Sequence, residues 1–328
     1  MSVPTTQKAI RIHENGGPEV IRYEDVPVPE VGERQILVKT EYSGVNFIES
    51  YFREGLYKAE LPLTLGREGA GEVMKVGSGV KKFAVGDKVG YCQPGAYCEY
   101  IALNEDARVV KVPDNLDTKQ VAASLIQGLT AFVLTTKTHP VKKGDYVLIH
   151  AAAGGTGLIL VQLAAHFGAN IIATTSTPEK AELVKNAGAQ HVVNYKTEDV
   201  VARVKEITNN KGVSVSFDSV GKTTWDISME SLGMHGHMVS FGNASGAAPP
   251  FSVLSLSAKN ISVTRPVLFN YIPDEKSWDE ITKEFFGLVN AGTVKIAISK
   301  TYPLKDFATA ITDLESGKTT GKLLMSHL

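Results

Sequence analysis

Residues 151–157 read Ala-Ala-Ala-Gly-Gly-Thr-Gly, and they stand between an apolar segment at 146–150 and a second one at 158–167. The first segment is typical of a buried strand and the second of a helix. At such a turn Gly154 allows backbone amides to approach a dinucleotide pyrophosphate, and Gly157 allows the helix to pack closely against the strand. Ala152 takes the place of the first glycine in the usual G-x-G-x-x-G pattern. The turn predicts a nicotinamide dinucleotide site that includes Gly154, Gly155, Thr156 and Gly157.

Length and composition favour an intracellular protein with a small-molecule partner. A chain of 328 residues predicts two domains, and 34 basic against 35 acidic residues provide no general attraction to nucleic acid or to an anionic membrane. The only cysteines, Cys92 and Cys98, are too few for a disulfide framework, which favours a reducing, cytoplasmic compartment. Residues 1–8 lack the pattern of a signal peptide, so export is not expected. Residues 146–167 are long enough to cross a bilayer, but three glycines interrupt them, and we expect no membrane span.

The first hundred residues predict a compact β domain. Short β-rich runs at 35–40, 69–76, 88–91 and 96–102 are separated by turn signals. Asp117 and Gln120 then resemble a capping pair that opens one helix, with apolar residues at helical spacing up to Val133. We expect this helix to connect two domains.

From Gly144 onward, strand and helix alternate. Such apolar strands between helices predict an α/β fold with a doubly wound parallel sheet that is covered on both faces. The expected strands lie at 146–150, 170–174, 191–194, 213–218, 237–242 and 261–264, and the expected helices start near 157, 178, 198, 223 and 251. The last segment predicts a helix around Trp278 and Phe285, a strand at 294–298, a helix at 306–315 and a strand at 322–325.

Six ordered motifs resemble the zeta-crystallin-like quinone oxidoreductases, a branch of the medium-chain dehydrogenase/reductase superfamily. They are GVNFIESY at 44–51, LGREGAG at 65–71, the 151–157 loop, FDSVG at 217–221, VSFGN at 239–243 and TYPL at 301–304. The resemblance spans nearly the whole chain. It implies a GroES-like, β-rich catalytic domain at 1–127, a Rossmann domain at 128–266, and a return to the catalytic domain at 267–328.

The sequence departs from the zinc alcohol dehydrogenases of the same superfamily. Arg67 stands where those enzymes have a histidine ligand, and Asn46 stands where they have a cysteine ligand. Because catalytic zinc normally needs three protein ligands, we expect no metal. We expect Glu68 to be structural and Arg67 to fill the vacated space.

The end of the second predicted strand favours NADPH over NADH. An NAD site would have an acidic residue there, but the chain has Thr174-Thr175-Ser176. Glu179 follows Thr177 and Pro178, which is an ordinary helix start, and Lys180 can bind a 2′-phosphate. The resemblance assigns Ser176, Lys180 and Tyr195 to this phosphate.

Without a metal, a flavin motif or an evident nucleophile, the simplest reaction is direct hydride transfer to an electron-poor acceptor such as a quinone. Asn46 and Tyr51, carried over from the family, are candidates to lie near the nicotinamide and the acceptor oxygen. Tyr57 either lines the pocket or is packing, and Arg265 either holds a phosphate or enolate-like oxygen or forms a surface salt bridge. By resemblance only, the further cofactor contacts are Asn46, Thr130, Ser219, Phe241, Gly242, Asn243, Phe269 and Lys322.

Two other functions stay open. The same fold and hydride chemistry serve reductases of 2-alkenals and other conjugated carbonyls. In a different class, zeta-crystallin relatives bind AU-rich RNA, although the near-neutral charge gives no electrostatic sign of RNA binding. The strand expected at 261–264 would be an apolar sheet edge, which predicts a homodimer through that edge.

Overall fold

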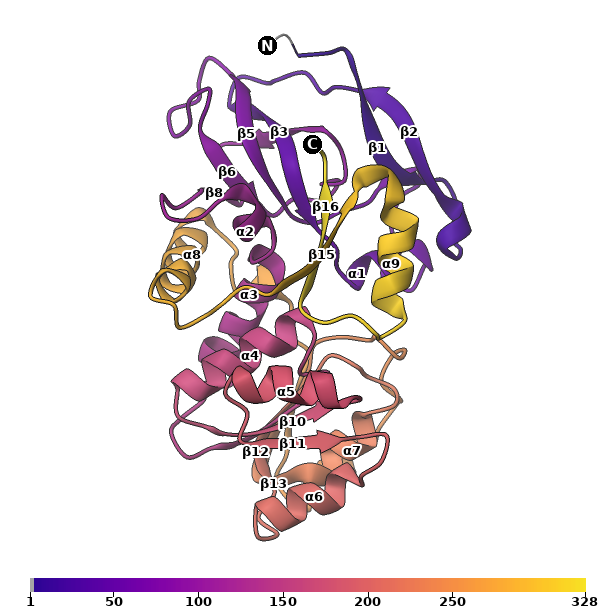
Figure 1. Ribbon diagram of the computed structural model, residues 1–328, viewed down its shortest axis with the longest axis vertical. Coiled ribbons are helices and arrows are strands. Elements are labelled where there is room, and N and C mark those ends of the chain that lie inside the picture. The colour runs from indigo at the N-terminus through magenta and orange to yellow at the C-terminus, as the bar shows by residue number, and fades with distance from the viewer. Residues whose placement is uncertain (1–2) are drawn as a thin grey trace. The chain divides into compact units, whose positions relative to one another are not determined.

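The computed structural model describes residues 3–328 (Figure 1). The chain divides into two compact units. The first unit runs from the N-terminal part of the chain to Ile126 and also contains Asp274–Phe286 and Ile296–Leu328, whereas the second unit contains Gln127–Pro273 and Gly287–Lys295.

We predicted domain limits at 127/128 and 266/267, and these limits stay a prediction. The two compact units differ from the predicted domains in that residues 267–273 and 287–295 belong to the second unit. Hydrogen bonds fix both pieces there. Tyr271 Oη accepts from Thr138 Oγ1 at 3.1 Å, and the Gln162 amide bonds both backbone groups of Lys295, at 2.7 and 3.2 Å.

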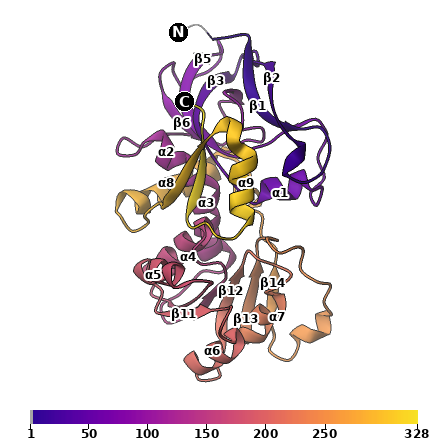
Figure 2. The ribbon, with the colours of Figure 1, turned by 45° about the vertical axis from the view of Figure 1, so that its right-hand side comes forward.

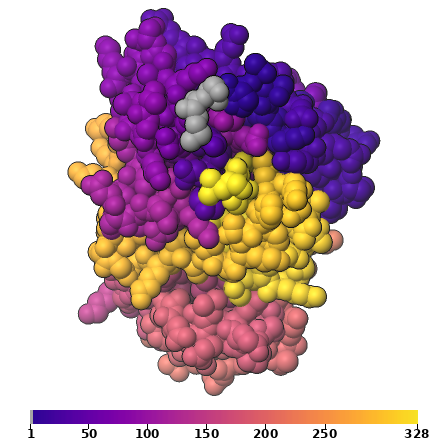
Figure 3. Space-filling view, turned by 45° about the horizontal axis from the view of Figure 1, so that its top comes forward, coloured from indigo at the N-terminus to yellow at the C-terminus, as the bar shows by residue number. Residues whose placement is uncertain are grey.

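The first unit is built around two sheets. The smaller sheet has the strand order β2-β1-β4, and the larger has the order β15-β16-β3-β5-β6-β8, with β7 paired to β3. The strands are β1 Thr6–Ile12, β2 Ile21–Pro27, β3 Gln35–Gly44, β4 Leu63–Thr64, β5 Gly69–Val76, β6 Lys88–Tyr91, β7 Tyr100–Asn104, β8 Val109–Lys111, β15 Ile298–Pro303 and β16 Lys322–Ser326. Because β16 pairs antiparallel with β3, the C-terminal strand lies in the sheet beside residues 42–44. Figure 3 shows the yellow C-terminal residues on the same face as indigo and purple residues of the first unit.

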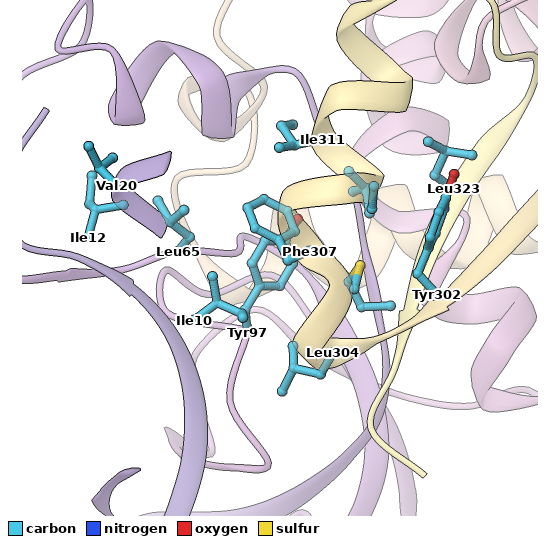
Figure 4. Close-up of a cluster of buried hydrophobic side chains, with 13 residues drawn as sticks. Ile10, Ile12, Val20, Leu65, Tyr97, Tyr302, Leu304, Phe307, Ile311 and Leu323 are labelled. Atoms are coloured by element: carbon cyan, nitrogen blue, oxygen red, sulfur yellow. The ribbon is translucent and has the colours of Figure 1, made fainter. Parts of the chain in front are cut away.

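A buried apolar cluster joins distant parts of the first unit. Phe307 opens α9 (Phe307–Glu315) and lies beside Tyr97, with the ring centroids 4.7 Å apart (Figure 4). Ile10 of β1 and Leu323 of β16 belong to the same cluster. Burial of these side chains is the main stabilisation that holds the C-terminal segment on the N-terminal sheets.

The capping pair is confirmed, but the single long helix that we expected after it is wrong. Asp117 accepts from the Gln120 backbone N–H and Gln120 accepts from the Asp117 N–H, which opens α2 (Thr118–Ala122). A second helix, α3 (Leu125–Val133), then starts anew and continues into a π-helical turn, Leu134–Thr138. The restart has a tertiary cause, since Glu68 accepts a hydrogen bond from the Ile126 N–H in the first turn of α3.

The second unit is a parallel six-stranded sheet with the order β11-β10-β9-β12-β13-β14 (Figure 2). Its elements are β9 Tyr146–Ile149, α4 Gly155–His166, β10 Asn170–Thr175, α5 Pro178–Asn186, β11 His191–Asn194, α6 Val200–Ile207, β12 Val213–Asp218, α7 Trp225–Ser231, β13 Leu232–Ser240 and β14 Ser262–Thr264. One face packs Leu148 and Met238 against Val204 of α6 and Trp225 of α7, and α4 and α5 contact β10. The predicted α/β class and doubly wound sheet are therefore confirmed.

Two expected elements differ from the structure. The helix expected near residue 251 is only a short 3-10 turn, Val253–Leu256, because its apolar side chains stay exposed and serine side chains bond its backbone. The strand expected at 294–298 begins instead at Ile298, since Gln162 already binds the backbone of Lys295.

Other expected elements are present. The helix around Trp278 is α8, Glu275–Asn290. Residues 146–167 form a strand, a turn and a helix, and among the described residues no helix has the length and apolar character of a membrane span.

Candidate active site

The predicted cofactor residues of the second unit lie where its parallel strands end. Tyr195 follows β11, Ser176 follows β10 and the glycine loop follows β9; on the other side, Ser219 follows β12, residues 241–243 follow β13 and Arg265 follows β14. The strand order reverses at β9, from which β10 and β12 extend in opposite directions. In open parallel sheets, ligands bind outside the carboxyl ends of the strands at such a reversal. The fold therefore brings these residues to one edge.

The glycine loop has the close packing expected at a dinucleotide turn. Ala151 takes a left-handed backbone angle, φ 48°, and its carbonyl accepts a hydrogen bond from the Gly154 N–H at 3.0 Å. A Cβ on Gly157 would lie 2.5 Å from the Ala151 carbonyl oxygen, so only glycine lets α4 start there. A Cβ on Gly155 would overlap the Gln127 amide, whereas one on Gly154 would be 3.3 Å from its nearest neighbour. The first turn of α4 thus presents backbone N–H groups beside glycines that carry no side chain, which fits a pyrophosphate.

Asp218 organises the neighbouring loops. Its fully buried carboxylate accepts hydrogen bonds from the Val220 and Gly221 N–H groups, at 2.7 and 3.0 Å, and from the hydroxyls of Thr224 and Ser228. A Cβ on Gly242 would overlap the Ser219 backbone, so these two loops are in direct contact. The Asp218 carbonyl also accepts from the Phe241 N–H at 2.8 Å. Ser219, Phe241 and Gly242 are therefore held together by a residue that we did not predict.

The ends of β10 and β11 form the predicted 2′-phosphate region. Thr175 and Asn194 are register partners, and the Tyr195 N–H donates to the Thr175 carbonyl at 3.1 Å, which places Ser176 and Tyr195 beside each other. Thr177 caps α5 by accepting from the Lys180 N–H, with Pro178 in the first turn.

The charges of this region also bear on the choice of cofactor. Hydrogen bonds from its own N–H and from the Thr177 hydroxyl lower the pKa of Glu179, so this carboxylate belongs to the helix start, as expected. Partial burial, followed by repulsion from the nearby Lys196, lowers the pKa of Lys180. Two neighbouring ammonium groups at this edge favour an anionic ligand.

Arg265 is exposed and bonds within its own unit. Its Nη1 donates to the Gly242 carbonyl at 3.1 Å and lies 3.5 Å from the Ser240 hydroxyl. Neither contact is a salt bridge, so the structure links Arg265 to the loop after β13. Its role toward a phosphate or an enolate-like oxygen stays a prediction.

In the first unit, Asn46 is part of a buried hydrogen-bonded cluster with Glu68 and Lys322. The three side chains are 6%, 0% and 1% exposed. Lys322 Nζ donates to Glu68 Oε1 at 2.7 Å, to Asn46 Oδ1 at 2.9 Å and to the Val45 carbonyl at 3.1 Å. Asn46 Nδ2 donates to Glu68 Oε1 at 2.8 Å and to the Gly44 carbonyl at 3.1 Å. Burial lowers the pKa of Lys322, and the Glu68 carboxylate opposes this effect.

A second buried carboxylate lies nearby in the same unit. Glu49 Oε2 accepts from the Gly66 N–H at 2.9 Å, and Glu49 Oε1 is 3.9 Å from Arg67 Nε. Burial raises the pKa of Glu49 to about 6, although the Arg67 guanidinium opposes the shift. The Arg67 guanidinium stacks on the Phe52 ring at 4.0 Å.

Tyr51 and Tyr57 belong to an aromatic cluster on and after α1 (Ile48–Arg53). Tyr51 is buried, and its ring centroid lies 5.3 Å from that of Tyr57. Tyr57 also packs edge-on against Phe52, with the centroids 5.6 Å apart. These contacts support the packing role that we considered for Tyr57, while the placement of Tyr51 near an acceptor oxygen stays a prediction.

The remaining assignments stay predictions. Thr130 lies in α3 and Phe269 in the 3-10 turn Leu268–Asn270, both half-buried in the second unit. Within residues 3–328, no group of three or more His, Cys, Asp or Glu side chains is arranged to hold a metal ion.

Sequence reasoning missed Asp218 and the contact between Glu68 and Lys322. Asp218 could have been found from its position, because an acid at the end of a buried strand followed by Ser-Val-Gly is a local turn signal. Glu68 and Lys322 are 254 positions apart, and no local pattern pairs them.

Comparison with known proteins supports the expected domain classes. Residues 32–114 match the family model described as alcohol dehydrogenase GroES-like domain, and residues 155–286 match the one described as zinc-binding dehydrogenase. The second match does not include residues 46 and 66–68, where the sequence departs from the zinc enzymes.

Relatives match over nearly the whole length. A quinone oxidoreductase of Pseudomonas aeruginosa is 42% identical over 322 residues, which are 97% of this chain and 99% of that protein. A 2-haloacrylate reductase of a Burkholderia species is 40% identical over 324 residues, 96% of this chain and 97% of that protein. The crystal structure of Escherichia coli quinone oxidoreductase complexed with NADPH is 42% identical and has a TM-score of 0.93, with 97% of this chain and 99% of that chain covered.

Proposed function

Because the chain belongs to the quinone oxidoreductase family of the medium-chain dehydrogenases/reductases, we propose that it is an NADPH-dependent quinone reductase. The observation that carries the proposal is the carboxyl edge of the parallel sheet. There a glycine loop in which Gly157 has no room for a side chain adjoins a region with Ser176, Lys180 and Tyr195, and the Glu179 carboxylate is engaged at the start of α5.

The residues at this edge fit a phosphorylated dinucleotide. The first turn of α4 would hold the pyrophosphate with backbone N–H groups, and Lys180 would hold the 2′-phosphate with its ammonium. The loops after β12 and β13 would line the site between Ser219 and Gly242. When bound, NADPH supplies the hydride, or single electrons in sequence, and solvent supplies the proton that completes the hydroquinone.

Quinone reduction suits a site with few polar catalytic groups. The reduced product is aromatic, so little acid catalysis is needed, and the protein acts mainly by positioning and electrostatics. Asn46 and Tyr51 are proposed to lie near the reacting groups, as in the family. Because Asn46 is held by Lys322 and Glu68, its position does not depend on a bound metal.

Cofactor choice provides the direct test. Exchange of Lys180 for Ala should raise the Michaelis constant for NADPH at least tenfold and that for NADH less than twofold, since only NADPH carries the 2′-phosphate. Lys185→Ala, in the last turn of the same helix, is the matched control. Equal changes for both cofactors in Lys180→Ala would refute the assignment.

A second candidate function is reduction of a conjugated double bond. The similarity to a 2-haloacrylate reductase favours it, because that protein's name describes an electron-poor alkene as acceptor. Oxidation of NADPH should therefore be followed with an ortho-quinone, a para-quinone, a 2-alkenal and 2-chloroacrylate in parallel. We expect turnover with the quinones, and preference for either alkene would replace the substrate class while leaving the cofactor proposal intact.

We also propose that the reaction is independent of zinc. Asn46 and Arg67 replace two zinc ligands, and Lys322 places an ammonium beside Asn46. Dialysis against a chelator should leave kcat unchanged, and stoichiometric zinc whose removal abolishes activity would contradict the proposal.

Three further properties complete the proposal. We propose a homodimer through the edge strand β14, because β14 ends the sheet order and Val253, Leu254 and Val267 are exposed in the same unit. A sedimentation mass of one chain would contradict the homodimer.

The free, buried Cys92 and Cys98 fit a cytoplasmic location, which a fluorescent fusion can test.

A net charge of −1 gives RNA no general attraction to the protein. We therefore expect no saturable binding of AU-rich RNA at physiological salt, with or without NADPH.

A further inference from the structure

The Lys322 ammonium has no hydrogen left for a ligand. An ammonium has three N–H donors, and in Lys322 they are directed to Glu68, Asn46 and the Val45 carbonyl, at 2.7, 2.9 and 3.1 Å. The side chain is only 1% exposed. A direct contact between Lys322 and a cofactor would require one of these bonds to break in a buried site.

The Asn46 amide is bonded almost as completely. Both Nδ2 hydrogens are donated, to Glu68 and to the Gly44 carbonyl, and Oδ1 accepts from Lys322. A carbonyl oxygen has two lone pairs, so one acceptor site on Asn46 Oδ1 is left. Turning the amide over would place its NH2 group against the ammonium and its oxygen against the carboxylate. The orientation of the Asn46 amide is therefore set by the charges of Lys322 and Glu68.

We propose that Lys322 and Glu68 are positioning residues that hold Asn46 as a hydrogen-bond acceptor and prevent it from donating. The ligand group that Asn46 can bind is then an N–H or O–H donor of the cofactor, namely the nicotinamide carboxamide or a ribose hydroxyl, and not the carbonyl oxygen of a quinone. The inference rests on the proposed function, because it takes Asn46 to lie in the reductase site.

The packing around the cluster agrees with a fixed arrangement. A Cβ on Gly44 would overlap the Glu68 carboxylate and would lie 2.7 Å from Lys322 Cε. Glu68 is fixed from its other side as well, since its Oε2 accepts from the Ile126 N–H at 2.7 Å. The carboxylate therefore has little freedom to turn away from Asn46.

A pair of variants separates positioning from simple charge compensation. Lys322→Met leaves a buried carboxylate without a cation and should lower Tm. Glu68→Gln combined with Lys322→Met removes both charges and should restore most of the lost Tm. In the double variant the new glutamine can donate where the carboxylate accepted, so Asn46 should turn over. We expect kcat to stay at least tenfold below the wild-type value and the dissociation constant for NADPH to stay at least fivefold above it.

Lys300→Met is the matched control, because Lys300 lies on β15, the strand next to β16, and its exposed ammonium pairs with Asp313 of α9. It should change neither quantity more than twofold. If the double variant regains wild-type kcat and NADPH affinity together with its Tm, Lys322 only compensates Glu68 and the proposal is wrong.

A direct observation of Asn46 tests the orientation without turnover. With selective 15N labelling of asparagine, and assignment by Asn46→Ala, both side-chain N–H signals should exchange slowly with solvent in the wild type. They should exchange at least tenfold faster in the double variant and in Gly44→Ala, which keeps both charges but displaces them. Equal exchange rates in all three proteins would overturn the proposal.

The donor on the cofactor is identified by titration with the reduced 3-acetylpyridine analogue of NADPH, which lacks the carboxamide N–H. If the carboxamide is the donor, Asn46→Ala should weaken NADPH binding and leave binding of the analogue unchanged. If a ribose hydroxyl is the donor, both should weaken equally. Unchanged binding of both would contradict the inference. The proposed function and the positioning role can fail separately. If the wild-type protein binds NADPH but reduces no quinone, the proposed function is rejected. If the Asn46 side-chain N–H groups still exchange slowly in that protein, the positioning role is retained.

Discussion

Asp218 in the second unit and Glu68 in the first are buried carboxylates that are stabilised in different ways. Asp218 in the second unit is surrounded by donors that carry no net charge, two backbone N–H groups and two hydroxyls. Glu68 in the first unit is paired with the Lys322 ammonium and also bonds Asn46 and the Ile126 N–H. Both are fully buried.

The difference follows from what each carboxylate holds. Neutral donors from neighbouring residues tie Asp218 to its own turn and to the start of α7, so its effect is local. The ammonium reaches Glu68 from β16, almost at the C-terminus, so this pair ties together segments far apart in the sequence. Removing one partner of a buried ion pair leaves an uncompensated charge, whereas a carboxylate among dipoles loses only hydrogen bonds.

The largest expected effect is on the ion pair. Lys322→Met should lower the free energy of unfolding by about 3–5 kcal/mol, because the Glu68 charge stays buried without a cation. The double variant with Glu68→Gln should recover more than half of this loss. Urea unfolding followed by fluorescence at neutral pH measures both, and a single variant that is as stable as the double would show that Glu68 needs no cation.

Asp218→Asn should cost less, about 1.5–3 kcal/mol, because the amide keeps one acceptor oxygen and loses charge-assisted hydrogen bonds. Ser214→Ala, in the same strand, removes a single bond to Asp145 at 3.2 Å and serves as the control, with an expected cost below about 1 kcal/mol. Urea unfolding measures both variants. A cost for Asp218→Asn equal to that of Lys322→Met would remove the distinction between the two carboxylates.

Glu49 is an intermediate case, with one N–H donor and an arginine nitrogen 3.9 Å away. Its folded-state pKa, raised to about 6 from 4.5, means that the protonated form is favoured in the fold. Its contribution to stability is therefore fully present below pH 4.5 and is lost as pH rises through 6, by about 2 kcal/mol in total. Unfolding free energies at pH 4.5 to 7.5 should show this loss in the wild type and not in Glu49→Gln. Parallel pH curves for the two proteins would rule out the raised pKa.

The last expected change concerns the glycine loop, where side-chain packing and not charge determines the effect of a substitution. Gly157→Ala should cost about 1–3 kcal/mol and raise the NADPH dissociation constant at least tenfold, because the new Cβ would meet the backbone oxygen of Ala151 at 2.5 Å. Gly154→Ala, whose Cβ would meet the same oxygen at 3.3 Å, should change the constant less than threefold. Fluorescence titration distinguishes them, and equal effects would mean that the loop is not packed as described.

Local patterns predicted helix starts in both units well, because the residues that determine them lie close together in the chain. The capping pair of Asp117 and Gln120 in the first unit is three positions apart, and Thr177 and Pro178 at the start of α5 in the second unit are adjacent, so both starts could be predicted without a tertiary structure. The helix predicted near residue 251 was wrong because its formation depends on tertiary contacts. Nothing in the local sequence showed that its apolar side chains would stay exposed.

The candidate site was only partly accessible from the sequence. The loops after β9, β10, β12 and β13 could be assigned because parallel strands bring their carboxyl ends to one edge. Asn46 and Lys322 were assigned by resemblance as cofactor contacts, but their contact with each other and with Glu68 could not be predicted, because it depends on β16 pairing with β3.

The sequence by itself determined the parallel nucleotide-binding sheet, the glycine turn and the absence of an acid at the end of β10, since periodicity, turn chemistry and residue identity act over a few positions. Only the tertiary structure decided how buried charges are neutralised. The Lys322 ammonium could equally have faced solvent, and the long-range pairing of β16 with β3 brings it to Glu68, where it fixes the orientation of Asn46. Desolvation makes that pairing obligatory once the segment is buried, because an unpaired charge in the interior costs more than the fold can tolerate.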